Sequence, residues 1–276
     1  MVEINVNGKL LPENEVKISP YNRALKFGDA IFETLKANKE NIYFLENHYF
    51  RIMSSMRMLR MKIPMHFTLE FFKTEIQKTI KANGLKDISR VRFTVFRKDG
   101  GLYLPETNEI LFIIEVADLH IPLYTDYEIE IFKDFSVSSG KLSNLKTNNR
   151  VLNVVASIFA DENDYQNSIL INEKKNIVEA VNANIFLVKE NVISTPALSE
   201  GCVNGIIRKK LIEMISSTTR FDIRETGILP MELLQADEVF LTNSIVEIQS
   251  VTKYRKKNYE VRVASKLRDL LRAEIS

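Results

Sequence analysis

One lysine stands in the stretch Ser143-Asn144-Leu145-Lys146-Thr147-Asn148-Asn149-Arg150, directly before a helical pattern that begins at Val151. A lysine that is partly desolvated can be neutral near pH 7 and act as a Schiff-base amine. Lys146 alone decides little, because the chain has 38 lysine and arginine residues and most such groups are solvated. Whether Lys146 has a chemical role depends on the sequence elements that flank it.

The residues before this stretch carry both strand and helix patterns. Val2 to Val6 alternates and ends at Asn7-Gly8, which predicts a strand entering a turn. Apolar residues recur at helical spacing over 45–59 and over 69–80, where Asn83-Gly84 closes the second helix. Further strands are predicted at 42–45, 91–95 and 110–116. We therefore expect an N-terminal α/β domain over residues 1–117.

Residues 118–127 contain a proline and little periodicity, and they form the candidate linker. Beyond it, strand patterns dominate, at 128–132, 168–172, 177–180, 185–188, 192–194 and 238–242. Helices are predicted over 151–160, from Asn204-Gly205, near Pro230, and at the C-terminus. We expect a second, barrel-like domain over 128–276, and an α+β fold for the whole chain.

Composition excludes several classes of protein. The 276 residues carry a net charge of +2, so broad nucleic-acid binding through a basic surface is not expected. The single cysteine, Cys202, allows no internal disulfide, and three widely spaced histidines argue against a zinc site. The longest apolar run, 110–117, is too short to span a bilayer, and the N-terminus lacks a signal-peptide pattern. We expect a cytoplasmic protein that binds no membrane and no metal.

Four further features could bind a ligand, and each has a structural alternative. Glu179 lies in an apolar strand, so it is either a buried, partnered carboxylate or on an exposed strand face. The loop Gly201 to Gly205 runs into a helix that either binds an anion or is simply capped. Thr242-Asn243-Ser244 leaves a strand and binds phosphate or caps a turn. Arg51 either pairs with phosphate or is one more exposed arginine.

Taken together and in order, these segments resemble the class IV (fold type IV) pyridoxal-phosphate enzymes. This family includes branched-chain and D-amino acid aminotransferases and 4-amino-4-deoxychorismate lyase. The resemblance spans nearly the whole chain. The segments that carry it are 27–34 (FGDAIFET), 48–51 (HYFR), 146–150 (KTNNR), 179–186, 201–208 and 236–244. It implies a smaller N-terminal α/β sandwich domain, a larger C-terminal pseudo-barrel domain, and a homodimer.

The resemblance also implies roles for individual residues. Lys146 is expected to hold pyridoxal 5'-phosphate covalently and to move protons, and Glu179 to face the pyridine nitrogen. The expected contacts to the rest of the cofactor are Arg51, Asn184, Gly205, the backbone N–H groups of Ile206 and Ile207, Asn243 and Ser244. The family usually has threonine at the position of Ile207, so one hydroxyl contact is missing. Of the Ser-Ser-Asn stretch common after the glutamate, only Asn184 is retained.

Within the family, several motifs are more similar to the lyase. They are Lys-x-x-Asn-Arg at 146–150, Gly-x-x-Asn-Gly-Ile at 201–206, and Thr34, where the lyase carries a threonine thought to assist proton delivery. Residues 97–101 resemble its Arg-x-x-Gly-Gly loop, but Leu102 replaces the following arginine, so Arg97 is the expected anion contact to the substrate.

The expected activity is therefore conversion of 4-amino-4-deoxychorismate to 4-aminobenzoate and pyruvate, a step in making a folate precursor. One alternative is an aminotransferase for branched-chain or D-amino acids. Another is a non-catalytic module that uses the same fold for binding.

Overall fold

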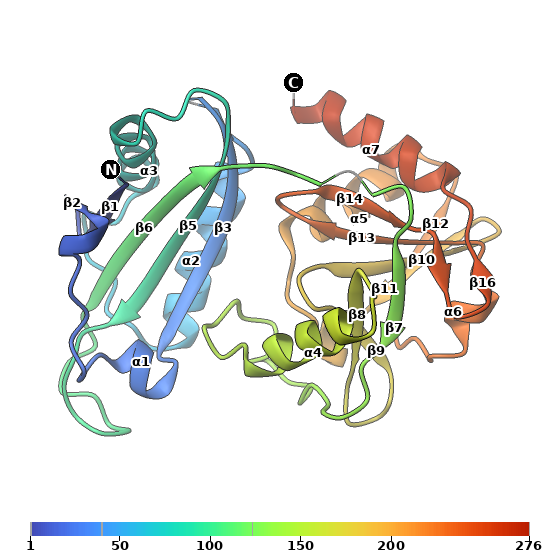
Figure 1. Cartoon of the computed structure of the whole chain (residues 1–276), viewed down its shortest axis with the longest axis horizontal. Coiled ribbons are helices and arrows are strands. Elements are labelled where there is room, and N and C mark those ends of the chain that lie inside the picture. Colours follow the sequence, from blue (N-terminus) through green and yellow to red (C-terminus); the bar gives the residue numbers. More distant parts are fainter. Residues whose placement is uncertain (1, 40, 123, 276) are drawn as a thin grey trace. The chain divides into compact units, whose positions relative to one another are not determined.

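The computed structural model describes residues 2–39, 41–122 and 124–275. It forms two compact units (Figure 1): unit 1 is Met1–Ile121 with Lys146–Asn149, and unit 2 is Pro122–Leu145 with Arg150–Ser276. The first division, between Ile121 and Pro122, falls inside the segment predicted as the linker. The assignment of Lys146–Asn149 to unit 1 was not predicted from the sequence, and it places the lysine segment on the N-terminal sheet.

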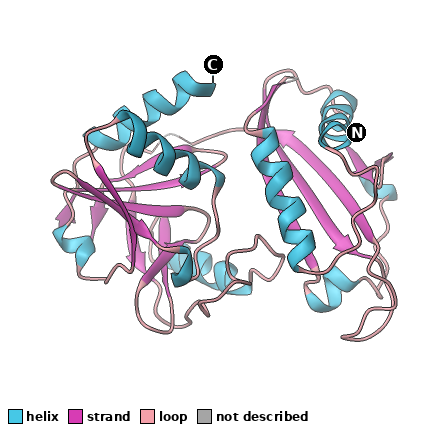
Figure 2. Ribbon diagram, turned by 180° about the vertical axis from the view of Figure 1, so that it is seen from behind, coloured by secondary structure: helices cyan, strands magenta, loops and turns pink. Residues whose placement is uncertain are grey.

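Unit 1 is a six-stranded sheet in the order β2-β1-β6-β5-β3-β4, with helices α2 and α3 on one face (Figure 2). All sheet pairings in this unit are antiparallel. Its elements are β1 (Glu3–Val6), β2 (Lys9–Pro12), η1 (Glu13–Glu15), α1 (Arg23–Phe27), β3 (Ala30–Asn38), β4 (Asn41–Ile42), α2 (Leu45–Met58), α3 (Leu69–Ala82), β5 (Ile88–Arg97) and β6 (Ile110–Asp118).

Alternation along β3 assigns its side chains to two faces. Ile31 and Leu35 join the core beneath α2 and α3, together with Val91 and Phe93 of β5. Aromatic packing dominates this core, where the Phe72 and Phe93 rings lie 4.6 Å apart. The intervening residues of β3, among them Phe32 and Thr34, occupy the face opposite the two helices.

The central strand β3 is one of the elements that the sequence patterns miss. Its segment AIFETLKAN places Glu33 among the core-facing positions, and a charged residue there breaks the expected apolar alternation. Glu33 is nevertheless only 1% exposed. Its burial is made possible by two partners on α2, the cation Arg51 and the imidazole of His48, which no local pattern can indicate.

Unit 2 contains two five-stranded sheets, in the orders β12-β11-β10-β13-β14 and β16-β15-β7-β8-β9. Helix α7 contacts β13 and β14, α5 contacts β12 and β13, and α4 contacts β8. The elements are β7 (Glu128–Ile131), α4 (Val151–Glu162), β8 (Asn167–Ile171), β9 (Ile177–Ala180), β10 (Asn184–Lys189), β11 (Val192–Pro196), η2 (Leu198–Glu200), α5 (Ile206–Thr218), β12 (Asp222–Thr226), α6 (Glu232–Gln235), β13 (Glu238–Asn243), β14 (Glu247–Val251), β15 (Lys253–Tyr254), β16 (Lys257–Asn258) and α7 (Arg262–Ile275).

The core of unit 2 depends on strands that are buried on both faces. Every residue of β9 is buried, and so is all of β10 except its last residue. The Phe186 and Phe240 rings stack 5.0 Å apart on neighbouring strands. The predicted α+β class is confirmed. No helix in the described ranges is long and apolar enough to cross a membrane.

Candidate functional site

Lys146 lies in a short segment that extends the sheet of unit 1. The backbone N–H of Phe32 donates to the carbonyl of Lys146 at 2.9 Å, and that of Asn148 donates to Ala30 at 2.9 Å. An antiparallel bridge joins Ile31 and Thr147 between them. Strand β4 pairs only with the far end of β3, at Ala37 and Asn38. The lysine segment therefore occupies the edge of β3 that β4 leaves open.

Gly28 allows the chain to approach this segment closely. Its φ is +63°, in the left-handed region, and a Cβ there would lie 2.2 Å from the side-chain oxygen of Asn149. The Asn149 side-chain amide donates to the Gly28 carbonyl at 3.3 Å. The glycine thus seats the lysine segment against the start of β3.

Two cations flank one aromatic ring beside the lysine segment. The Lys146 Nζ lies 4.5 Å from the centroid of the Phe32 ring, and the Arg92 guanidinium carbon lies 3.8 Å from the same centroid. Arg92 Nη2 also donates to Asn148 Oδ1 at 3.2 Å. Thr34, opposite Arg92 in the sheet register, is half-buried, and its hydroxyl makes no hydrogen bond within the described residues. These side chains share the sheet face that α2 and α3 leave uncovered.

The helix-covered face carries a buried ionic cluster. Glu33 accepts hydrogen bonds from Arg51 Nε at 2.7 Å, from Arg51 Nη2 at 2.5 Å, and from His48 Nδ1 at 2.7 Å. Burial acts to raise the pKa of Glu33, but the charge and hydrogen bonds of Arg51 and His48 outweigh it and lower this pKa to about 2. The carboxylate is therefore ionised throughout the ordinary pH range.

His48 completes this cluster as a neutral side chain. Burial is the main cause that lowers its pKa below 6.5, and the charges of Arg51 and Lys146 act in the same direction. Because a carboxylate only accepts, the single ring proton belongs on Nδ1, and Nε2 is left as an acceptor. Nε2 is buried and has no hydrogen-bond partner among the described residues. A buried acceptor without a partner calls for a ligand or water contact.

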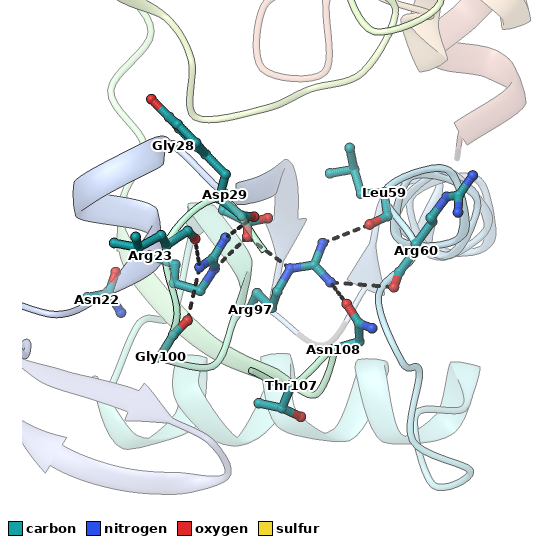
Figure 3. Close-up of polar contacts among 12 residues, drawn as sticks. Asn22, Arg23, Gly28, Asp29, Leu59, Arg60, Arg97, Gly100, Thr107 and Asn108 are labelled. Atoms are coloured by element: carbon teal, nitrogen blue, oxygen red, sulfur yellow. Dashed lines mark hydrogen bonds and ion pairs between the residues drawn. The ribbon is translucent and has the colours of Figure 1, made fainter. Parts of the chain in front are cut away.

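Arg97, the predicted substrate contact, makes hydrogen bonds within unit 1. Its guanidinium is bonded to Asp29 Oδ2 at 2.9 Å, to Asn108 Oδ1 at 2.5 Å and to the Leu59 carbonyl at 2.7 Å (Figure 3). The residue is 6% exposed. The arginine is held inside unit 1 because Asp29, a carboxylate 68 residues away in sequence, pairs with it.

The same aspartate binds a second arginine that holds the glycine loop. Arg23 Nε pairs with Asp29 Oδ2 at 2.9 Å, and its Nη1 donates to the carbonyls of Gly100 at 3.0 Å and Leu102 at 2.6 Å. Leu102 itself is 74% exposed. The Arg-x-x-Gly-Gly stretch therefore serves to anchor this loop to the start of β3.

In unit 2, Glu179 is buried rather than on an exposed strand face. It lies on β9 at 6% exposure, and its Oε2 accepts from the backbone N–H of Val203 at 2.8 Å. Asn144 steadies the same loop from the other side, since its side-chain amide donates to the carbonyls of Leu198 and Cys202 at 2.8 and 2.7 Å. The carboxylate and the loop before α5 are thus fixed to each other.

The start of α5 is uncapped and closely packed. Gly205 is its N-cap residue and offers no side-chain cap, so the first N–H groups of the helix, at Ile206 and Ile207, receive no side-chain acceptor from the cap. A Cβ on Gly205 would lie 2.0 Å from Asn184 Oδ1, and Asn184 Nδ2 donates to the Val203 carbonyl at 2.9 Å. The side chains of Ile206 and Ile207 are buried. Where the family has a threonine, Ile207 contributes to the core and leaves only its backbone donor.

The turn after β13 contains a mixture of used and unused polar groups. Asn243 Oδ1 accepts from the backbone N–H groups of Ile245 and Val246, both at 2.9 Å, so it caps this turn. Ser244 is half-buried, and its hydroxyl makes no hydrogen bond within the ranges that the structure describes. The Thr242 hydroxyl is buried and also unpartnered there. The Asn243 side chain therefore caps the turn, and the Ser244 hydroxyl keeps its hydrogen-bonding capacity for a ligand such as phosphate.

The family is established by comparison with known proteins. Residues 30–254 match the model of the amino-transferase class IV family, so the chain belongs to this family. It is a pyridoxal-phosphate-dependent enzyme, as the resemblance implied, and the non-catalytic reading is set aside.

Individual relatives differ in their named activities. D-alanine aminotransferase of Bacillus licheniformis is 26% identical over 269 residues, covering 91% of this chain and 88% of that protein. Aminodeoxychorismate lyase of Bacillus subtilis is 26% identical over 267 residues, covering 93% and 88%. A solved branched-chain aminotransferase of Thermoproteus uzoniensis, 21% identical, superposes with a TM-score of 0.90 over 99% of this chain and 94% of that one. The last shows the fold, and equal identity to two activities leaves the reaction open.

Sequence reasoning missed the partners of the residues that it named. Glu33 and His48 lie within the segments that carry the family resemblance, but the sequence predicted no role for them. It also predicted no role for Arg92. The spacing of His48 and Arg51, three residues apart on one helix, is a usable signal for two side chains on one face. Nothing local marks Arg92, because its importance comes from β3 and the lysine segment.

Proposed function

We propose that Lys146 binds pyridoxal 5'-phosphate covalently and that Glu179 faces its pyridine nitrogen. The proposal is supported by the chemistry of one residue in each unit. Lys146 is a half-buried amine held by backbone pairing, and Glu179 is a buried carboxylate with a fixed orientation. A carboxylate at this position keeps the pyridine nitrogen protonated, and the bound cofactor then withdraws electrons from the substrate carbon next to the amine.

The proposed phosphate contacts are backbone and side-chain hydrogen-bond donors. They are the N–H groups of Ile206 and Ile207 at the uncapped start of α5, the Ser244 hydroxyl and Arg51. Gly205 fits this role because a side chain there would occupy the position of Asn184. Asn243 would act through its backbone, since its side-chain oxygen caps the turn. Arg51 binds Glu33 through Nε and Nη2, and its positive charge would attract the phosphate.

We further propose that the reaction is cleavage of 4-amino-4-deoxychorismate to 4-aminobenzoate and pyruvate. Lys146 would accept the proton from the ring carbon that carries the amino group. The carbon–oxygen bond to the side chain would break with the electrons leaving on oxygen, and the released enolate would take a proton on its methylene carbon to become pyruvate. Orientation and charge supply the protein's contribution, since gain of aromaticity favours the step.

The observation that carries the lyase proposal is the position of Thr34. It shares the uncovered sheet face with Phe32, whose ring contacts Lys146, and it keeps a hydroxyl with no hydrogen bond in the described structure. On this proposal, the Thr34 hydroxyl passes a proton to the leaving group.

Incubation of the cofactor-loaded protein with 4-amino-4-deoxychorismate tests this proposal, with pyruvate and 4-aminobenzoate followed together. We expect equal amounts of both products, loss of turnover in Lys146→Ala, and a drop of about 100-fold in Thr34→Ala, with Thr34→Ser much closer to the parent. A protein that carries the cofactor band but releases no pyruvate would contradict the lyase assignment.

An aminotransferase for branched-chain or D-amino acids is the second candidate. It is favoured by the D-alanine aminotransferase relative, whose identity to this chain equals that of the lyase. A half-reaction separates the two, because only an aminotransferase converts its bound cofactor to the amine form when given D-alanine or L-leucine alone. Thr34→Ala would not be expected to block that conversion.

We also propose a homodimer located in the cytoplasm. Support for self-association comes from α4, where Val151, Val154 and Ile158 form an exposed apolar stripe at helical spacing, with exposed fractions of 77%, 56% and 50%. Sedimentation should give a dimer, and Val154→Glu should shift it toward monomer. A monomeric parent protein at micromolar concentration would contradict this part of the proposal.

A further inference from the structure

Glu200 is a buried carboxylate in unit 2 that the proposed function leaves without a role. It is the last residue of η2 and is 9% exposed. Its Oε2 accepts from Asn172 Nδ2 at 2.7 Å and from Asn176 Nδ2 at 3.0 Å, and within the described residues it makes no ion pair with a lysine, arginine or histidine. Burying a carboxylate is costly unless its oxygens are hydrogen-bonded, so the two amides make this burial possible.

Both amides belong to the turn between β8 and β9. Asn172 Oδ1 accepts from the backbone N–H groups of Lys174 and Asn176, both at 3.0 Å, so this oxygen caps the turn. Asn172 Nδ2 also donates to the backbone carbonyl of Glu200 at 3.2 Å. The turn therefore binds Glu200 through its carboxylate and through its backbone.

Glu200 and Glu179 belong to one closed ring of contacts. Asn176 lies three residues before Glu179, and Glu200 lies three residues before Val203. The bond between Asn176 and Glu200 links the two segments at one end, and the 2.8 Å bond from the Val203 N–H to Glu179 Oε2 links them at the other. Movement of Glu200 away from the turn would therefore displace Val203 from Glu179.

The other side of the loop 201–205 is closely packed. Gly201 has a φ of +103°, and a Cβ there would lie 3.2 Å from the Ser139 Cα. Ser139 is bound to the same turn, because its backbone N–H donates to Glu173 Oε2 at 3.0 Å. The start of the loop thus lies between the β8–β9 turn and the Ser139 segment, and Glu200 supplies the carboxylate that binds it to the turn.

We infer that Glu200 is a positioning residue for the cofactor site of unit 2: by binding the β8–β9 turn, it keeps the Val203 N–H on Glu179 and keeps the start of α5 in place. This inference rests on the proposed function, in which Glu179 faces the pyridine nitrogen and the N–H groups of Ile206 and Ile207 bind the phosphate. Glu200 would act through the loop, without touching the cofactor.

The first test measures the dissociation constant of pyridoxal phosphate for the full-length chain, by titration of the lysine-dependent absorbance band. Glu200→Ala removes the acceptor of both amides, and we expect it to weaken binding by about tenfold. Glu200→Gln keeps a side-chain oxygen that can accept from both amides, so its affinity should stay within about threefold of the parent. The pair of variants separates the hydrogen bonds of this side chain from its charge.

Hydrogen exchange of the cofactor-free protein gives a second measurement, which needs no ligand. The N–H of Val203 is protected by its bond to Glu179. Peptides that cover residues 201–205 should therefore exchange at least about fivefold faster in Glu200→Ala. Exchange in β14 should stay as in the parent, which distinguishes movement of the loop from loss of the fold.

Glu130→Ala is the matched control. Glu130 lies on β7 with a side chain that is 15% exposed, and it binds Arg255 through two hydrogen bonds at 3.0 and 3.1 Å. Its removal should lower the Tm but leave the cofactor affinity and the exchange over 201–205 unchanged. Thermal unfolding checks that every variant is folded, and if Glu200→Ala fails to fold, Asn176→Ala takes its place because it removes one of the same bonds.

The outcomes separate this inference from the proposed function. If Lys146→Ala loses the band and Glu200→Ala matches Glu130→Ala in affinity, the positioning role of Glu200 is overturned and the cofactor role of Lys146 stands. If Lys146→Ala still forms the band, the proposed function itself fails. Unchanged exchange over 201–205 in Glu200→Ala, or a Glu200→Gln variant that binds as weakly as Glu200→Ala, also overturns the positioning role.

Discussion

Glu33, which is buried, and Asp29, which is half-buried, are carboxylates four residues apart in unit 1, and each binds two basic side chains. Asp29 binds both Arg23 and Arg97. The other guanidinium N–H groups of these arginines donate largely to backbone carbonyls of two loops. Glu33 joins Arg51 and His48, and there the His48 Nε2 is left without a partner in the described structure. The polar groups of the Asp29 cluster bind one another and the backbone, whereas the Glu33 cluster retains one acceptor for a ligand. A buried ionic cluster is thus better judged by the atoms it leaves unsatisfied than by its charges.

The largest effect that this comparison predicts follows from Glu33→Gln. Removing one partner of a buried ion pair leaves Arg51 uncompensated, so we expect the free energy of unfolding to fall by about 3–5 kcal/mol. Urea denaturation at pH 7 measures it.

The parent protein should also lose stability in acid through this residue. Because the pKa of Glu33 is lowered from 4.5 to about 2 in the folded state, its contribution is present above pH 4.5 and is lost as pH falls toward 2. Glu33→Gln should lack that component, and identical acid profiles for the two proteins would contradict the argument.

Asp29→Asn should cost less, about 2–3 kcal/mol, because Asp29 is more exposed and part of both arginines stays bound to carbonyl oxygens. Its distinctive result should be local: faster proteolysis in the loop held by Arg23, with the affinity for pyridoxal phosphate unchanged. Limited proteolysis and cofactor titration check the two parts. A weakened cofactor site in this variant would show that the two clusters are not separable.

A pair of equivalent substitutions sharpens the contrast between the clusters. Arg51→Lys and Arg97→Lys each replace a planar, multidentate group with a point charge. We expect Arg51→Lys to weaken pyridoxal phosphate binding by about tenfold and Arg97→Lys to leave it within about twofold, with KM for the substrate also unchanged in the latter. If KM rises strongly in Arg97→Lys while the protein stays folded, Arg97 contacts the substrate as the sequence predicts.

The smallest predicted effect concerns His48 and pH. Its folded pKa is lowered, so below pH 6.5 the unfolded chain gains a proton that the folded chain does not, and stability falls as pH falls. The slope from one such group cannot exceed about 1.4 kcal/mol per pH unit. His48→Asn should remove it between pH 6.5 and 5.5, as measured by urea midpoints, and an unchanged slope would count against a neutral His48.

Local patterns predict elements well where one face alternates cleanly. The helices over 45–59 and 69–80 were predicted nearly to the residue, as α2 and α3, and the second ends at Asn83 as predicted. The strand β3 was missed because a buried Glu33 breaks its pattern, and the burial is understood only from α2. The motif around Arg97 shows the residue's neighbours in sequence but could not reveal that Asp29 binds it.

The chain by itself determined the family, the cofactor and the order of the chemical groups, because these depend on residue types at fixed spacings that survive in one dimension. Tertiary structure decided which groups meet. Lys146 pairs with the edge of β3 more than a hundred residues earlier, Arg92 reaches the Phe32 ring from β5, and Glu179 is fixed by the N–H of Val203. Such contacts depend on strand register and on which carboxylate reaches which cation, and the free energy of those pairings arises only once distant segments are folded together.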